Sequence, residues 1–281
     1  MGFFLVLKAE LVRTFIIMRR YWFATLTSLI IGYGMLMGLI LGFMARRDQV
    51  NEIIDNRFGV DPSSATNAAL GLIIGSFAFG IIGIFSQGLQ NMARSGQLEQ
   101  LCLSPHGLVT NFLARSFVGS VASIFTSSIV LFLVARSVEG RIHADPLPTV
   151  ALLLLTYVDL IGFGFMLGGL VLLFKQTGQV AVIVRIALLG LAVWATDRVE
   201  TGYAILDLLV HVLPVTDAAI CLKHVLIRGQ ILAETGQFAS VFELSSFYYL
   251  VINSVVWTAI GITVFKWMEN WSRDKGTLGS Y

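Results

Sequence analysis

Charged residues are scarce in this chain. Lys, Arg, Asp and Glu make up 13% of its 281 residues, which is about half the share found in soluble globular domains. Hydrophobic residues make up 56%, and the mean hydropathy is +0.82. The shortage of charge, together with apolar runs of about 20 residues, excludes a soluble globular protein and predicts a helical protein that crosses a membrane several times.

Cysteine and the common catalytic motifs are also missing or rare. Cys102 and Cys221 are the two cysteines; we expect them on opposite sides of the membrane, without a disulfide, and no CxxC metal-binding spacing is present. The sequence has no GxxxxGK(S/T) phosphate loop, which excludes ATP hydrolysis by that route, and no HExxH or GxSxG motif. We therefore predict no catalytic residue, no metal site and no cofactor on this chain.

Six apolar runs have the composition of membrane-spanning helices, which predicts an all-α fold with one transmembrane domain over residues 1–281. The runs cover residues 23–43, 68–86, 108–134, 148–174, 179–195 and 247–267. Residues 3–22 precede the first run. They carry apolar side chains at helical spacing, from Leu7 to Trp22, among several basic residues, which predicts an interfacial helix lying on the membrane.

The charges before the first run predict the orientation. Lys8, Arg13, Arg19 and Arg20 lie ahead of it, and basic residues next to a span favour the cytoplasmic side. The first run also has the full length of a span, so we expect a membrane anchor and not a cleaved signal sequence. Six spans place both termini on one side, so the sequence predicts a multi-pass protein of the cell (inner) membrane with cytoplasmic termini.

The first predicted span contains a stripe of glycines, Gly34, Gly38 and Gly42. Small residues every four positions let two helix backbones approach closely. We expect this stripe to form a contact between two subunits. The alternative stays open that the spacing arises by chance, because glycine is common in membrane helices.

Residues 94–107 form a short amphipathic segment between two long apolar runs. Leu98 and Leu101 share one face of a helix, Glu99 projects from another, and Pro105 and Gly107 are expected to end the helix. A helix this short is marginal alone in water, so it must rest on another surface. An ordinary cytosolic connector between two spans would fit the same pattern.

This segment resembles a motif of one transporter family. Its residues Gly96, Gln97, Leu98, Glu99, Gln100, Leu101, Ser104 and Pro105 are similar to the GTLEQL…(S/T)P segment in the permease subunits of type-two ABC exporters, with Gln97 where the family has Thr. The resemblance implies that residues 94–107 are a coupling helix, which docks into a groove of a separate ATP-hydrolysing subunit.

Residues 204–229 hold two helical pieces, each too short to span, on either side of Pro214. They predict a re-entrant or surface-lying hairpin on the outer side. The run from Leu213 to Thr216, followed by residues 227–229, is similar to the P(L/V)T…R…G run that precedes the last span of the same family. We expect Asp207 and His211 to face water there, and His211 has no evident partner in the sequence.

Away from the ends of the predicted spans, two charged residues lie inside them, Asp159 and Arg185. Such residues are costly in a membrane and usually face protein or a water-filled cavity. They are candidates for the lining of a substrate path, together with Asp207, His211 and Pro214 as a gate. A structural role inside the helix bundle is an equal alternative, although their different depths argue against a direct salt bridge between them.

The resemblance implies a permease subunit of an ATP-driven exporter of an amphiphilic or apolar substrate: a drug, a lipid or a lipid-linked glycan. It also implies a second permease chain, identical or related, and two ATPase subunits that bind the ATP and Mg. Two alternatives remain. An ion-gradient-driven transporter would need inverted repeats and carboxylates at the midplane, and a lipid-modifying enzyme would need a cluster of polar catalytic groups at one depth.

Overall fold

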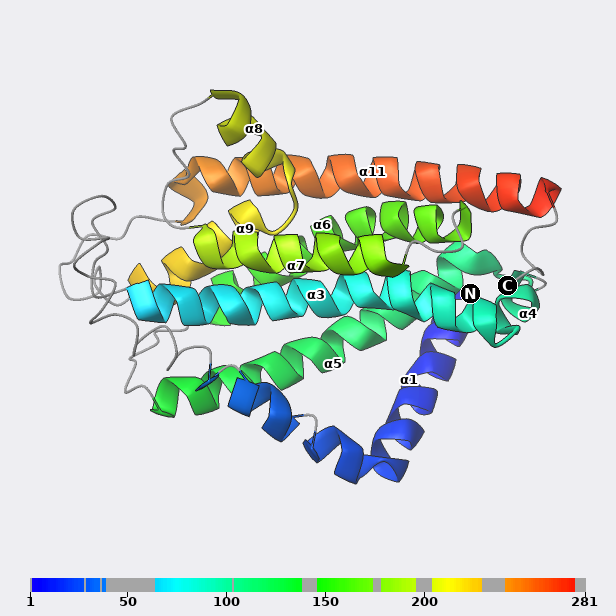
Figure 1. Cartoon of the computed structure of the whole chain (residues 1–281), viewed down its shortest axis with the longest axis horizontal. Coiled ribbons are helices and arrows are strands. Elements are labelled where there is room, and N and C mark those ends of the chain that lie inside the picture. The colour runs from blue at the N-terminus through cyan, green and yellow to red at the C-terminus, as the bar shows by residue number, and fades with distance from the viewer. Residues whose placement is uncertain are drawn as a thin grey trace.

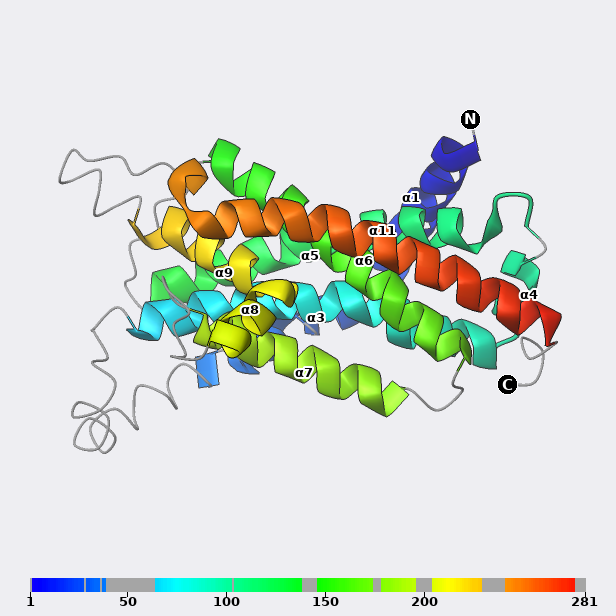
Figure 2. The ribbon, with the colours of Figure 1, turned by 90° about the horizontal axis from the view of Figure 1, so that it is seen from above.

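The computed structural model describes residues 2–27, 29–35, 37–38, 64–102, 104–137, 146–173, 178–195, 204–228 and 241–275. The regular elements in these ranges are helices, and no strand occurs among them. The long helices lie along one axis and form a bundle (Figures 1 and 2). They are α3 (Ser64–Arg94), α5 (Gly107–Ser137), α6 (Pro146–Leu173), α7 (Gly178–Trp194) and α11 (Ser245–Asp274). The prediction of an all-α fold is confirmed.

Four of these helices, α3, α5, α6 and α11, are long and apolar enough to cross a membrane. They contain most of the predicted spans 68–86, 108–134, 148–174 and 247–267. The predicted span 179–195 corresponds to α7, which has 17 residues. The predicted span 23–43 begins as a shorter apolar helix over Trp22–Met35, and residues 39–63 lie outside the described part. A membrane protein with four candidate spans is therefore supported, whereas six spans remain a prediction.

The N-terminal helix α1 (Gly2–Arg20) lies across the bundle and not along it (Figures 1 and 2). It packs mainly against α5. Apolar side chains such as Phe4, Phe15 and Ile16 stay exposed on it, next to the exposed basic residues Arg19 and Arg20. This mixture of exposed apolar and basic side chains suits a helix at a membrane surface, as the sequence predicts.

The centre of the bundle is a cluster of phenylalanines, one from each of four helices. Phe85 of α3, Phe112 of α5, Phe165 of α6 and Phe265 of α11 are each at most 1% exposed. The ring centroids of Phe85 and Phe165 are 4.7 Å apart, and those of Phe165 and Phe265 are 5.2 Å apart. Aromatic side chains bury large apolar areas and favour such tilted contacts, so this cluster ties the four long helices together.

Glycines set the closest helix approaches. A side-chain carbon placed on Gly261 of α11 would lie 1.8 Å from the carbonyl oxygen of Gly162 in α6, so the backbones of α6 and α11 touch there. On α3, Gly71 and Gly75 meet the backbone of α7 in the same way, at Ala192 and Leu189. Small residues allow this packing between apolar helices, where the membrane provides no hydrophobic driving force.

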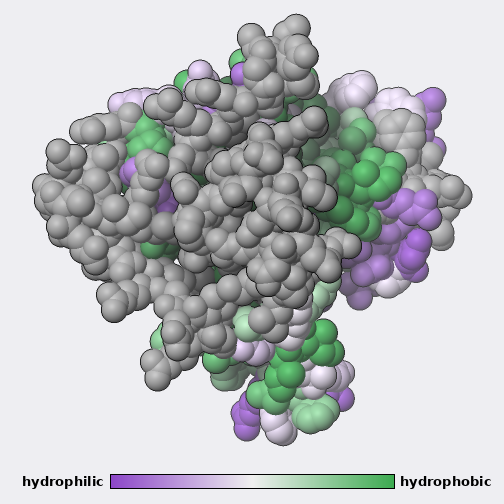
Figure 3. Space-filling model, turned by 60° about the vertical axis from the view of Figure 1, so that its left-hand side comes forward, coloured by the Kyte–Doolittle hydropathy of each residue, from purple (hydrophilic) through white to green (hydrophobic). Residues whose placement is uncertain are grey.

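The outer flank of the bundle is apolar. On α11, exposed side chains include Tyr248, Ile252, Val255 and Trp267. Figure 3 shows one face of the molecule. In its coloured part, hydrophobic side chains in green gather on the flank, and hydrophilic side chains in purple lie beyond them. An apolar flank along helices of spanning length is the surface that lipid chains would contact.

Candidate functional site

The chain breaks between two short helices, α8 (Ala204–Val212) and α9 (Thr216–Lys223), and then continues as a π-helical turn, η1 (His224–Arg228). Pro214 lies in the break, as the sequence predicts. The next residue, Val215, has a φ of 88°, which is strained for a β-branched residue and costs about 1–3 kcal/mol. The break lies near one end of the bundle, far from the short helix α4 (Gln97–Cys102) at the other (Figure 1).

Asp159 of α6 supports this strained break. Its side chain is buried, at 1% exposure, and it accepts a hydrogen bond from the backbone N–H of Val215. Its Oδ1 atom has no hydrogen-bond partner within the described residues. A buried carboxylate oxygen without a partner is energetically costly. Asp159 is therefore a candidate functional residue.

His211 and Asp217 join the two short helices. Nδ1 of His211 lies 2.8 Å from Oδ1 of Asp217, and the Asp217 side chain is only 2% exposed. The imidazole stacks on the ring of Tyr249, with centroids 4.7 Å apart. The sequence alone shows no evident partner for His211, and the structure corrects this: the partner is Asp217. The two residues lie on opposite sides of the helix break, so the spacing of residues along one helix does not reveal the pair.

One face of α11 holds the end of α8. Tyr249, Asn253 and Trp257 recur every four residues, and side chains at this spacing share a helix face. The Asn253 side chain donates a hydrogen bond to the carbonyl of His211, at 2.5 Å, and Trp257 Nε1 donates to the carbonyl of Val212, at 2.9 Å. These donors satisfy carbonyl groups that the end of a helix leaves free, so α8 is fixed in position against α11.

The two acidic side chains of this site interact with each other. The charge of Asp217 acts unfavourably on Asp159. Asp217 lies on α9, which is too short to span a membrane, and burial raises its pKa to about 6, although the neighbouring His211 opposes the shift. Two buried carboxyl groups and an imidazole therefore lie together at this helix break. Asp207 of α8 is half-buried close by in the sequence.

Arg185 is separate from this cluster. Its Nε donates to the backbone carbonyl of Phe79 in α3 at 2.9 Å, and its guanidinium lies 3.6 Å from the centroid of the Phe79 ring. It also fills the space beside Gly83. Asp159 and Arg185 therefore do not pair, in agreement with their predicted difference in depth. Arg185 contributes to the α3–α7 contact, which favours the structural alternative for this residue.

Lys223 is a buried cation that was not among the candidate site residues predicted from the sequence. It is 3% exposed, and its Nζ donates to the carbonyls of Ala192 at 2.8 Å and Val193 at 3.2 Å, and to that of Ala195. These carbonyls belong to the end of α7, where a helix has free acceptors and a negative dipole end. The ammonium group therefore caps a helix that lies about 30 residues earlier in the chain.

The predicted coupling segment forms the six-residue helix α4 between α3 and α5. Two glycines with positive φ lie on either side of it: Gly96, directly before the helix, at 71°, and Gly107, at the start of α5, at 69°. Leu98 is fully buried and Leu101 is half-buried, whereas Gln97 and Gln100 are exposed. The helix ends at Cys102, before the predicted stops; Ser104 and Pro105 follow in a turn, and Gly107 begins α5.

The predicted interface glycines have open surroundings in the single chain. Among the described residues, nothing lies within 4 Å of a side-chain carbon placed on Gly34 or Gly38, and Gly42 lies outside the described part of the chain. Within the described ranges, no group of three or more His, Cys, Asp or Glu side chains could hold a metal ion.

Comparison with known proteins does not identify a family: no protein-family model, no curated protein and no solved structure matches this chain.

Proposed function

We propose that this chain is the permease subunit of an ATP-driven exporter that moves an amphiphilic or apolar substrate, such as a drug, a lipid or a lipid-linked glycan, outward across the membrane. The observation that carries the proposal is the construction of α4. Leu98 anchors this helix in the bundle, while Gln97 and Gln100 stay exposed for a partner. Its sequence resembles the coupling helix of type-two ABC permeases.

The partners follow from this assignment. Two permease chains would enclose a path, with the open glycines Gly34 and Gly38 available at the contact between them. Two separate ATPase subunits, which bind ATP and Mg, would dock below, one under each α4. The assembly would lie in the cell (inner) membrane, with both termini and α4 in the cytoplasm.

The arrangement of helices supports a rigid-body mechanism. Helix α4 connects directly to α3 and α5, which have 31 residues each and reach the other end of the bundle (Figure 1). ATP binding would close the ATPase pair and move α4, and the long helices would transmit that movement to the break between α8 and α9, which acts as the outer gate. Such a switch requires that ATP bind one arrangement better than the other.

Charge reversal at Glu99 tests the proposal. A single charge on a short connector is expected to contribute at most about 1 kcal/mol to stability, so Glu99→Lys should leave the fold intact. We expect it to abolish most of the substrate-stimulated ATP hydrolysis of the reconstituted complex. Asp274→Lys, a reversal at the exposed end of α11, is the matched control. Normal stimulation and transport in Glu99→Lys would contradict the role of α4.

A second candidate function rests on the cluster at the helix break. Ion-coupled transporters place carboxylates at broken helices, and Asp159, Asp217 and His211 have that arrangement. Under this alternative, a proton gradient would drive transport without ATP, and Asp159→Asn would abolish it. Transport that requires ATP and persists without an ion gradient would exclude this alternative.

A further inference from the structure

A polar cavity of about 230 Å³ lies where α1, the end of α3, α4 and α5 meet. Six polar side chains line it: Glu10, Arg13, Gln97, Gln100, Asn111 and Arg115. They come from α1, α4 and α5, so the folded chain brings Glu10 and Arg13 next to residues about 100 positions later in the sequence. The helix break lies at the opposite end of the bundle (Figure 1), so this cavity is separate from the site described above.

The cavity has an excess of positive charge. Nη1 of Arg13 lies 3.1 Å from Oε1 of Glu10, so the one carboxylate in the cavity is already paired. Arg115 has one hydrogen bond within the described residues, from Nη1 to the thioether sulfur of Met92 at 3.5 Å, and a thioether is a weak acceptor. The two guanidinium groups repel each other, and Glu10 also acts favourably on Arg115. With two arginines and one glutamate in its lining, the cavity keeps an excess of one positive charge.

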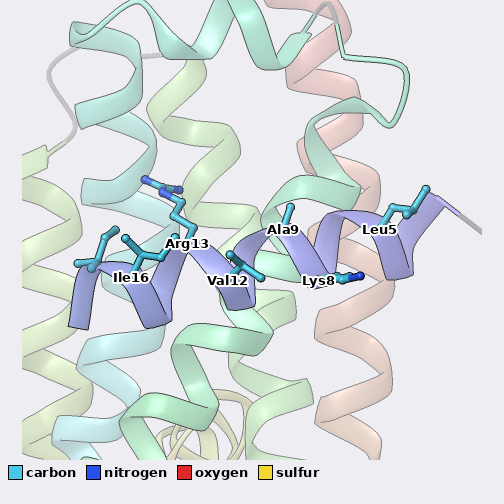
Figure 4. Close-up of a pocket in the computed structure, with 7 residues that line it drawn as sticks. Leu5, Lys8, Ala9, Val12, Arg13 and Ile16 are labelled. Carbon is cyan, nitrogen blue, oxygen red and sulfur yellow. The ribbon is translucent and has the colours of Figure 1, made fainter. Parts of the chain in front are cut away.

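An apolar hollow adjoins this cavity along α1. Figure 4 shows the apolar side chains Leu5, Ala9, Val12 and Ile16 lining the hollow together with the basic side chains Lys8 and Arg13. Arg13 lines the polar cavity as well, so one side chain borders both. A ligand that fills both would have an anionic group at one end and an apolar chain at the other.

The depth of the cavity also suits a membrane surface. Arg115 lies eight residues after Gly107, where α5 begins, which is about 12 Å along the helix. Helix α1 lies across the bundle and exposes apolar residues beside Arg19 and Arg20, as helices at the boundary between headgroups and acyl chains do. The polar cavity therefore lies where lipid headgroups would be.

We propose that this cavity binds the phosphate group of an anionic membrane phospholipid, with an acyl chain along the apolar face of α1. Guanidinium groups bind phosphate oxygens through charge-assisted and often paired hydrogen bonds, and Gln97 and Gln100 add amide donors. The proposal requires a membrane protein but no ATPase partner, so it can be tested on this chain alone, although Gln97 and Gln100 also belong to the surface proposed for the ATPase subunit. Because Gln97 and Gln100 belong to α4, a bound lipid would also fix the position of that helix.

Lipid titration of the purified full-length chain tests this assignment. The chain, delipidated in detergent, is titrated with phosphatidylglycerol and with phosphatidylcholine of the same acyl chains, and bound lipids are counted by native mass spectrometry. We expect one phosphatidylglycerol per chain to bind at least about tenfold more tightly than phosphatidylcholine. Arg115→Gln and Arg13→Gln should each weaken phosphatidylglycerol binding by about tenfold, the loss typical of a charge-assisted hydrogen bond.

Matched variants separate a defined site from general attraction to anionic lipid. Arg19→Gln removes one exposed charge from α1 outside the cavity and should retain wild-type affinity. Arg13 is 48% exposed, so Arg13→Gln should fold normally even if a change at Arg115 disturbs packing. Equal losses in Arg19→Gln and Arg13→Gln, or no preference for phosphatidylglycerol in the wild type, would overturn the proposal.

Inorganic phosphate and glycerol 3-phosphate distinguish a lipid headgroup from a soluble anion. With a lipid site, neither compound at millimolar concentration should displace phosphatidylglycerol, because neither fills the apolar hollow. Displacement at micromolar concentration, with the same dependence on Arg13 and Arg115, would show a site for a soluble phosphate and would overturn the assignment to a lipid.

Discussion

At the scale of single residues, the ionisation of Asp217 opposes folding. Burial raises its pKa to about 6, above the ordinary value of 3.8, so the folded chain favours the protonated carboxyl. The stability that this group provides at low pH is therefore lost as the pH rises from about 4 to about 6. Asp217→Asn imitates the protonated form and should avoid this loss.

We therefore expect Asp217→Asn to be more stable than the wild type at pH 7.5, by roughly 1–3 kcal/mol, since one pKa unit corresponds to about 1.4 kcal/mol. The two proteins should be equally stable near pH 4. Thermal unfolding in detergent across this pH range measures the difference, with the exposed Asp274→Asn as control. An Asp217→Asn variant that is less stable at pH 7.5 would show that the ion pair with His211 outweighs the cost of burial.

Lys223 leads to a second prediction at this scale. Replacing it with Met should leave the carbonyl groups at the end of α7 without a donor, because Nζ donates to Ala192 and Val193. We expect a loss of about 2–4 kcal/mol, since unsatisfied buried acceptors and lost charged hydrogen bonds each cost this order of energy. Lys266→Met removes an exposed lysine from α11 and should cost less than about 0.5 kcal/mol. Equal melting temperatures for the two variants would disprove the capping role.

The residues of the site differ in how well the sequence predicts them. Asp159 and Pro214 stand out because a charge or a proline inside an apolar run is unusual, and that signal is local. Asp217 and Lys223 do not stand out in this way. Considered with their sequence neighbours alone, they indicate a loop exposed to water. Their partners are in α8 and α7, and contacts between separate helices leave no periodic signal in a single sequence.

At the scale of helices, the contact between Gly162 and Gly261 holds α6 against α11. The side-chain carbon of Gly261→Ala would meet the Gly162 backbone, so the two helices would have to move apart. We expect a loss of about 1–3 kcal/mol in unfolding free energy, although alanine is the better helix former. On α7, no atom of the described residues lies within 4 Å of a side-chain carbon placed on Gly190. Gly190→Ala should therefore be neutral or slightly stabilising. Similar stability of both variants would contradict a tight crossing.

The helices themselves are largely predictable. Apolar length is a local property, so four of the six predicted spans lie within α3, α5, α6 and α11 or overlap them almost completely. Pro214 likewise places the break between α8 and α9. The pairing of helices is not predictable in this way. The glycine stripe at Gly34 stands out in the sequence, but the described residues place no atom within 4 Å of a side-chain carbon there. Gly162 and Gly261, far apart in sequence, make a close contact.

At the scale of the whole molecule, the two ends of the bundle differ in chemistry. One end carries α4 and the cavity lined by Arg13 and Arg115, and the other carries the break between α8 and α9 with its buried acidic pair. Long helices join the two ends (Figure 1). Under the proposed function, these helices would connect a driven end with a gating end. The sequence alone does not reveal the driving partner, which would be a separate chain.

Site-specific photocrosslinking from α4 tests the central claim most directly. A photoreactive phenylalanine analogue replaces the exposed Gln100 in the full-length chain, and the membranes of the native host are irradiated with and without ATP. We predict a crosslink to an ATPase subunit with a phosphate-binding loop, and its yield should change when nucleotide is trapped. The same analogue in place of Tyr248, near the start of α11 at the opposite end of the bundle from α4, should give no such crosslink. No ATPase crosslink from position 100, or equal yields from positions 100 and 248, would contradict the account.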